Sequence, residues 1–374
     1  MLPFQVAVAL LAFIASAILF TVGGSAAIVG YHLAFAAGIL PLILAAMAHF
    51  VPVLARSSPA PLSVRLLPLL ALLGACSVLL YFTHPELAPF GHLDGAVLTG
   101  SAVVGLGAWA WRLRSKAIGT PHPGLDWYLV ALACLLLGLT AILLGHWLPE
   151  QRNALRIFHL HMNTLGFIGI TALGTLQVLL PTVAQKPDPD IAVRMRLHMK
   201  WVIAATLVTA CTVAWHPAFA WIGLLLFAVP LAGIGRAWLR LYAAHIFALH
   251  GAIPSLAAAL AGFIFTLVLA AINGYLQLDY QPLQLFIIGF LMPLVIGAAS
   301  YLLPLWLKPG RLTEWHHSAR RCMGFGSGIR SVILLLGGIM AGLGIQAGWW
   351  LALLAVVSFV ISLLLAMTRT AAAS

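Results

Sequence analysis

Charged residues are scarce in this sequence. Asp, Glu, Lys and Arg together make up 7% of the 374 residues, whereas soluble domains carry roughly 25%. Apolar residues make up 63%, and a soluble fold could not cover so much apolar surface with so few polar groups. The composition therefore excludes a soluble globular protein and predicts an all-α membrane protein that has the lipid bilayer as its partner.

Cysteines are also few, and acidic residues are nearly absent from the expected membrane-spanning segments. The four cysteines are isolated, and neither a CxxC pair nor a CxxCH motif is present, so covalent attachment of a c-type heme is not expected. The eight acidic residues fall in expected loops or at helix ends. Because ion-coupled transporters usually bury a carboxylate within the membrane, this pattern disfavours ion-coupled transport and leaves neutral solutes or histidine relays open.

Twelve apolar runs are long enough to cross a bilayer, whose hydrocarbon core requires roughly 20 residues of helix. Each run is bounded by charge, glycine or proline. The expected helices cover residues 3-23, 28-53, 64-83, 95-113, 127-147, 157-183, 199-215, 219-239, 247-273, 283-306, 329-345 and 347-367. The sequence thus predicts about twelve transmembrane helices.

The basic residues indicate an orientation. If the N-terminus lies inside, every Lys and Arg of the 19 in the chain, except Arg152 and Arg156, falls on the inner side, as the positive-inside rule requires. This pattern predicts a multi-pass protein of a bacterial inner membrane with both termini in the cytoplasm. The net charge of +11 is then spread over several short loops and the tail, so no nucleic-acid partner is expected.

Three of the apolar runs resemble one another and align without gaps. They are YHLAFAAGILPLILAAMAHFVP (31–52), LHMNTLGFIGITALGTLQVLLP (160–181) and LQLFIIGFLMPLVIGAASYLLP (283–304). Glycines and prolines recur in register, Gly166 with Gly289 for example, and small residues mark close helix approach. The offsets of 129 and 123 residues make these the second, sixth and tenth helices. We therefore predict a single domain, 1-374, of three pseudo-symmetric four-helix units at approximately 1-125, 126-246 and 247-374.

The layout and one helix resemble a known superfamily. Twelve helices in three arcs of four, with the segment HLHMNTLGFIGITALGTLQVLLP (159–181), look like subunit I of the heme-copper oxidases and nitric oxide reductases. The size and helix count also resemble the NnrS-type heme and copper membrane proteins. In the oxidase superfamily the second, sixth and tenth helices carry metal-binding histidines toward the outer side of the membrane. The resemblance implies that fold and a heme or copper cofactor.

Histidines within the repeat point to the same chemistry. His32 aligns with His161 near the outer ends of the second and sixth helices, and two imidazoles from facing helices are the usual ligands of a six-coordinate heme b. His159 lies two residues before His161, about 200° away around a helix, so it would serve a different site. The alternative is that these imidazoles simply bond a backbone carbonyl or a Ser or Thr hydroxyl.

A copper site is a weaker expectation. His146 ends the fifth helix and could lie near His159, which makes His146, His159, His161 and His32 the candidate metal ligands. Interface chemistry beside Trp147 is the alternative for His146. The sequence does not bring three histidines to one outer site, so heme b is the expected cofactor and copper the weaker expectation.

Departures from the superfamily limit the functional prediction. The third repeat has Gln284 where the others have His32 and His161, and the seventh helix has no pair of histidines in its outer half. A complete terminal oxidase is therefore not expected. The preferred hypothesis is a heme-binding oxidoreductase component, with a redox partner protein, in electron transfer, nitric oxide or oxygen handling, or heme and copper homeostasis. The alternative is a cofactor-free membrane transporter or scaffold.

Overall fold

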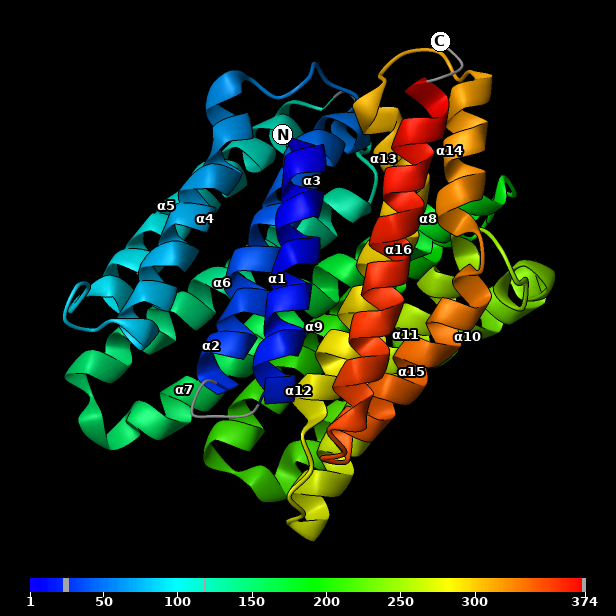
Figure 1. Ribbon diagram of the computed structural model, residues 1–374. Helices are drawn as coiled ribbons and strands as arrows, with labels where there is room; N and C mark the ends of the chain where they lie inside the picture. Colours follow the sequence, from blue (N-terminus) through cyan, green and yellow to red (C-terminus); the bar gives the residue numbers. More distant parts are fainter. Residues whose placement is uncertain (23–26, 118, 372–374) are drawn as a thin grey trace. The chain divides into compact units, whose positions relative to one another are not determined.

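The protein is all-helical, as predicted. The computed structural model describes residues 1–22, 27–117 and 119–371, and every regular element in those ranges is a helix (Figure 1). Within these ranges twelve stretches are long and apolar enough to cross a membrane, which confirms the expected number. They are Leu2–Val22, Ala27–Ala55, Leu62–Thr83, Gly91–Lys116, Gly124–Trp147, Pro149–Ala184, Ile191–Trp215, Pro217–Ile246, Ile253–Leu276, Pro282–Leu307, Glu314–Gly342 and Ala347–Thr368.

The eleventh stretch begins well before its predicted start at residue 329. It consists of α14 (Glu314–Gly324) and α15 (Ser327–Gly342), which Figure 1 shows as two separate helices. Hydropathy missed α14 because its sequence, EWHHSARRCMG, is mostly polar. The helix is interrupted at Gly326, whose φ of 66° lies in the left-handed region that glycine adopts most easily. Arg330, expected at the inner membrane surface, lies in the first turn of α15, inside the 29-residue stretch, and is only 7% exposed.

The second, sixth and tenth helices share an irregularity that the sequence did not predict. Each is interrupted by a π-helical segment that begins one or two residues after the aligned position of His32, His161 and Gln284. The order is α2 (Ala27–His32), η1 (Leu33–Ile39) and α3 (Leu40–Ala55); α7 (Arg152–His161), η3 (Met162–Gly169) and α8 (Ile170–Ala184); and α12 (Pro282–Leu285), η5 (Phe286–Leu291) and α13 (Met292–Leu307). Because π-helices are rare, this is a structural similarity independent of the residue matches.

Other features recur at the same spacing. The helices that start at Leu62, Gly91 and Gly124 have counterparts 129 residues later, namely α9 (Ile191–Trp215), α10 (Ala220–Ile246) and α11 (Ile253–Leu276). Two helix ends also match, since Arg56 and Gln185 both have a left-handed backbone, with φ of 52° and 51°. The threefold repeat stays a prediction, but these recurrences are what such a repeat requires.

The chain divides into two compact units. Unit 1 comprises Tyr31–Val178 and Pro189–Ile234, and unit 2 comprises Leu2–Gly30, Leu179–Asp188 and Gly235–Ser374. Unit 1 holds all the histidines predicted to bind heme or metal.

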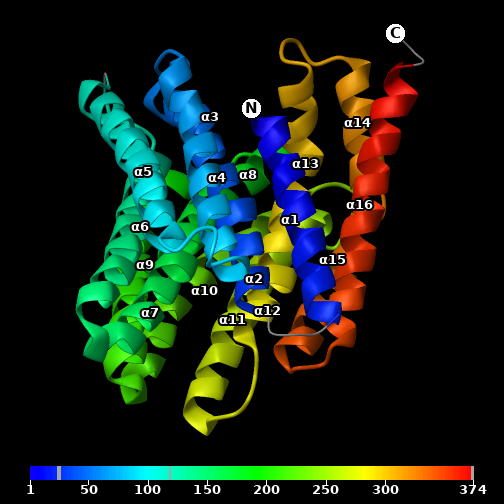
Figure 2. The ribbon, with the colours of Figure 1, turned by 60° about the vertical axis from the view of Figure 1, so that its left-hand side comes forward.

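Within unit 1, α4 (Leu62–Thr83) and α5 (Gly91–Lys116) form a tight hairpin (Figure 2). Glycine makes this contact possible, because a Cβ on Gly95 would lie 2.7 Å from the carbonyl oxygen of Gly74. A Cβ on Gly91 would lie 2.4 Å from the Ser77 carbonyl oxygen. The start of α5 is therefore held directly against the last turns of α4.

Within unit 2, α11 packs against the π-helical segment η5. A Cβ on Gly262 would lie 1.8 Å from the carbonyl oxygen of Gly289, so the two backbones are in direct contact. Aromatic rings lie beside this contact, and the ring centres of Phe263 and Phe290 are 5.0 Å apart. Gly289 is one of the glycines that the repeat alignment marked for close helix approach, and the structure confirms that prediction.

Candidate functional site

His159 is anchored to a neighbouring helix. It lies on α7, and its Nδ1 is 2.8 Å from the carbonyl oxygen of Gly138 on α6 (Gly124–Trp147). The side chain of Asn163 donates to the backbone carbonyl of His159 at 2.6 Å. Gly138 leaves room for both groups, since a Cβ there would lie 2.9 Å from the Asn163 amide nitrogen. The position of the His159 ring is thus fixed by two helices.

His161 is anchored within its own helix. Its Nδ1 is 2.9 Å from the carbonyl oxygen of Ile157, one turn earlier. The expected difference in direction between His159 and His161 agrees with these partners, because one ring bonds α6 and the other bonds α7.

These bonds determine the protonation of both rings. A carbonyl oxygen only accepts hydrogen bonds, so Nδ1 of each neutral ring carries the proton and Nε2 carries a lone pair. Neither Nε2 has a hydrogen-bond partner in the described part of the chain. Histidines that bind metals commonly donate their other ring N–H to a backbone carbonyl in this way. The carbonyl bond also fits the alternative of a purely structural histidine, and what favours ligation is the Nε2 lone pair, which makes no hydrogen bond within the described residues.

His32 contacts the end of α4. Its ring lies 4.8 Å from that of Phe82, measured between ring centres. Its charge also has a weak electrostatic effect on His159 of the sixth helix. The sequence groups His32 with His161 because the two align in the repeat, and that grouping stays a prediction.

His146 has a neighbour that the sequence prediction missed. Its ring centre is 6.4 Å from that of His92, and no hydrogen bond or ring contact joins His146 to His159 among the described residues. His146 also packs edge-on against Trp147, 5.5 Å away, as the interface alternative expected. The topology did contain the signal: His92 begins the fourth helix and His146 ends the fifth, so an antiparallel hairpin brings the two to the same end.

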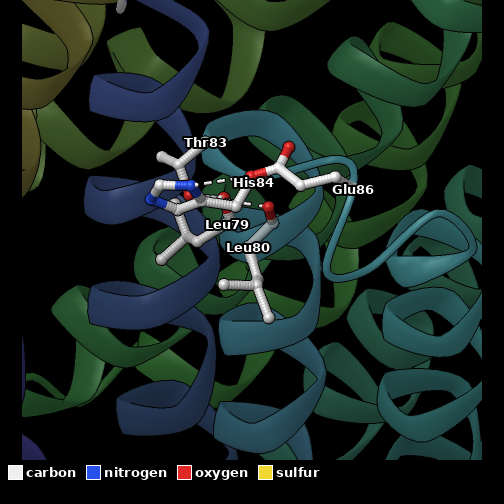
Figure 3. Close-up of polar contacts among 5 residues, drawn as sticks. All are labelled: Leu79, Leu80, Thr83, His84 and Glu86. Carbon is white, nitrogen blue, oxygen red and sulfur yellow. Dashed lines mark hydrogen bonds and ion pairs between the residues drawn. The ribbon is translucent and has the colours of Figure 1, made fainter.

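The turn between α4 and α5 adds polar groups to this end of unit 1. Figure 3 shows His84 Nδ1 paired with the Glu86 carboxylate at 3.1 Å, and the Thr83 hydroxyl donating to the Leu79 carbonyl. The backbone N–H of Glu86 and the His84 ring both lower the pKa of the Glu86 carboxyl below its ordinary value. Glu86 therefore holds its negative charge to lower pH than an isolated carboxylate.

A buried histidine of α9 was also missed. His198 is 5% exposed, and its Nδ1 has no hydrogen-bond partner among the residues the structure describes. The sequence placed it at the inner side because Arg196 and Lys200 flank it, and no sequence signal separated it from those exposed neighbours.

Metal binding by a larger cluster is not seen. In residues 1–22, 27–117 and 119–371, no group of three or more His, Cys, Asp or Glu side chains is placed to hold a metal ion. One pair of imidazoles lies side by side, that of His92 and His146, with ring centres 6.4 Å apart.

Neither the protein-family models nor the curated proteins searched contain a match to this sequence. The site must therefore be interpreted from its own chemistry.

Proposed function

We propose that this membrane protein binds heme b, with His32 and His159 as the axial ligands. The observation that carries the proposal is the His159 ring, whose Nδ1 proton is committed to Gly138, with His32 of the second helix near enough to affect it electrostatically. A committed Nδ1 proton leaves Nε2 available to iron. His161, with its own Nδ1 bonded to Ile157, is the candidate ligand for a second site. A bound heme supplies one-electron chemistry or gas binding.

The proposal extends to location and partners. A multi-pass protein with its basic residues mostly on one side fits a bacterial inner membrane with both termini in the cytoplasm. The heme would then lie toward the periplasmic side, where a redox partner protein could exchange electrons with it. Electron transfer, nitric oxide or oxygen handling, and heme and copper homeostasis are the functions consistent with this arrangement.

A cofactor-free transporter is the second candidate, because one observation favours it. The eleventh span is broken at Gly326, and Arg330 is buried four residues later with its guanidinium donating to the Met323 carbonyl at 2.6 Å. Broken helices and buried ionisable residues are typical of substrate sites in transporters.

A reduced-minus-oxidised absorption spectrum of the detergent-purified full chain tests the heme proposal. We expect the bands of a b-type heme in the wild type, their loss in His32→Ala and His159→Ala, and no change in His216→Ala, which removes an exposed imidazole. Iron and monomeric protein are assayed on the same samples. Wild-type protein without heme, purified from heme-replete cells, would favour the transporter. Unchanged spectra in both ligand variants would refute this ligand pair.

A further inference from the structure

The ends of α5 and α6 present two imidazoles to each other. His92 lies in the first turn of α5 and His146 in the last turn of α6, with their ring centres 6.4 Å apart. Neither ring makes a hydrogen bond within the described residues, and Nδ1 of His92 is shielded from solvent without any partner. A buried polar nitrogen without a partner is uncommon in native structures and calls for an explanation such as a bound ion.

The protein holds one of these rings firmly in place. Gly91, which precedes His92, packs directly on the Ser77 carbonyl of α4. The ring of Tyr81, also on α4, lies 4.5 Å from the His92 ring. His146 lies opposite it on α6 and is more exposed to solvent than His92. A rigid ligand facing a more accessible one suits a site that an ion enters from solution.

The ring spacing discriminates between metal geometries. With metal–nitrogen bonds of about 2 Å and about 1.2 Å from nitrogen to ring centre, two imidazoles trans to each other place their centres about 6.4 Å apart. Two imidazoles on a tetrahedral ion such as Zn²⁺ place them at about 5 Å. The separation of 6.4 Å between the ring centres therefore leaves room for the trans arrangement, which is found in the square-planar geometry of Cu²⁺.

The surrounding charge is mixed, because the Arg152 guanidinium donates to the Gly145 carbonyl beside His146 at 3.2 Å, while two carboxylates lie on the His92 side. Asp94, one of the two acidic residues nearest this end of α5, interacts electrostatically with His92. Glu86 lies in the preceding turn, paired with His84. These carboxylates lower the cost of bringing a divalent cation to neutral imidazoles.

We propose that His92 and His146 bind one copper ion between them, with water completing its coordination. This site is separate from the proposed heme ligands and requires no heme. It goes beyond the heme function because it would give the protein a second metal, at the exposed end of the α4–α5–α6 group.

Equilibrium binding of Cu²⁺ to the purified full chain is the test, with electron paramagnetic resonance of the bound ion. We expect one Cu²⁺ per chain, a signal split by two equivalent nitrogens, and at least a tenfold loss of affinity in both His92→Ala and His146→Ala. His216→Ala is the matched control, because it removes another exposed imidazole of unit 1 and should leave the affinity unchanged. Thermal unfolding verifies that each variant is folded.

The outcomes separate this proposal from the heme proposal. Copper affinity that survives in either folded variant, or that falls equally in His216→Ala, would overturn the site. Binding of Zn²⁺ as tight as that of Cu²⁺ would refute the trans geometry. His32→Ala should keep its copper, so loss of heme in that variant does not affect this test.

Discussion

Replacing Gly262 by alanine should strongly destabilise unit 2. The added Cβ would lie 1.8 Å from the Gly289 carbonyl oxygen, 2.3 Å from its carbonyl carbon and 2.9 Å from the Phe290 nitrogen. All three are backbone atoms, so no side chain can rotate away. To reach an ordinary contact of 3.4 Å or more, α11 and η5 must separate along their whole interface.

The magnitude follows from the packing. Overfilling a well-packed core costs about 1–3 kcal/mol when side chains can adjust, and here the obstacle is backbone, so we expect a loss of at least about 3 kcal/mol. Gly274→Ala is the control on the same helix, because no atom lies within 4 Å of its added Cβ. In Gly274→Ala the better helix propensity of alanine should contribute up to about 1 kcal/mol of stability.

Thermal unfolding of both variants in one detergent measures the difference. We expect the midpoint to fall by several degrees for Gly262→Ala and to stay equal or rise for Gly274→Ala. Equal midpoints for Gly262→Ala and the wild type would refute the direct backbone contact between α11 and η5.

Two further predictions concern buried polar groups. Burial, followed by the charge of Arg196, lowers the pKa of His122 below 6.5, and Gly124 N–H donates to its Nδ1 at 3.1 Å. As the pH falls, His122 therefore takes up its proton at a higher pH in the unfolded chain than in the folded protein, so stability should fall as the pH drops below about 6.5. Thermal unfolding midpoints measured between pH 8 and 5 should decline less in His122→Gln than in the wild type. Trp349→Phe removes the bond from the indole N–H to Gln284 Oε1 (2.8 Å) and should cost about 1–3 kcal/mol, measured by thermal unfolding. An unchanged midpoint would contradict a stabilising role for this bond.

Hydropathy and charge were sufficient to predict the class and the spans. An apolar helix that faces lipid has a sequence signal along its whole length, so the twelve stretches could be found from composition alone. The start of the eleventh could not, because α14 is polar and only tertiary contacts reveal it. One such contact joins His316 Nε2 to the Lys308 carbonyl oxygen at 2.9 Å, and His316 is only 2% exposed.

The candidate site was predictable only in part. Sequence alignment selected His32 and His161, but which imidazoles approach each other depends on helix rotation, and the π-helical segments alter that rotation. His92 and His146 could have been paired from the sequence. Consecutive membrane spans run antiparallel, so the start of α5 and the end of α6 lie at the same end of their hairpin.

The three π-helical segments also bear on the history of the chain. Each adds a wide turn one or two residues after the aligned position of His32, His161 and Gln284, in η1, η3 and η5. Three separate origins of so rare a distortion at matching positions would be a coincidence, whereas gene duplication of one four-helix ancestor that already contained it needs a single event. On this account the ancestral unit had the distortion before any of its copies acquired or lost a histidine, and Gln284 records a later divergence of the third copy.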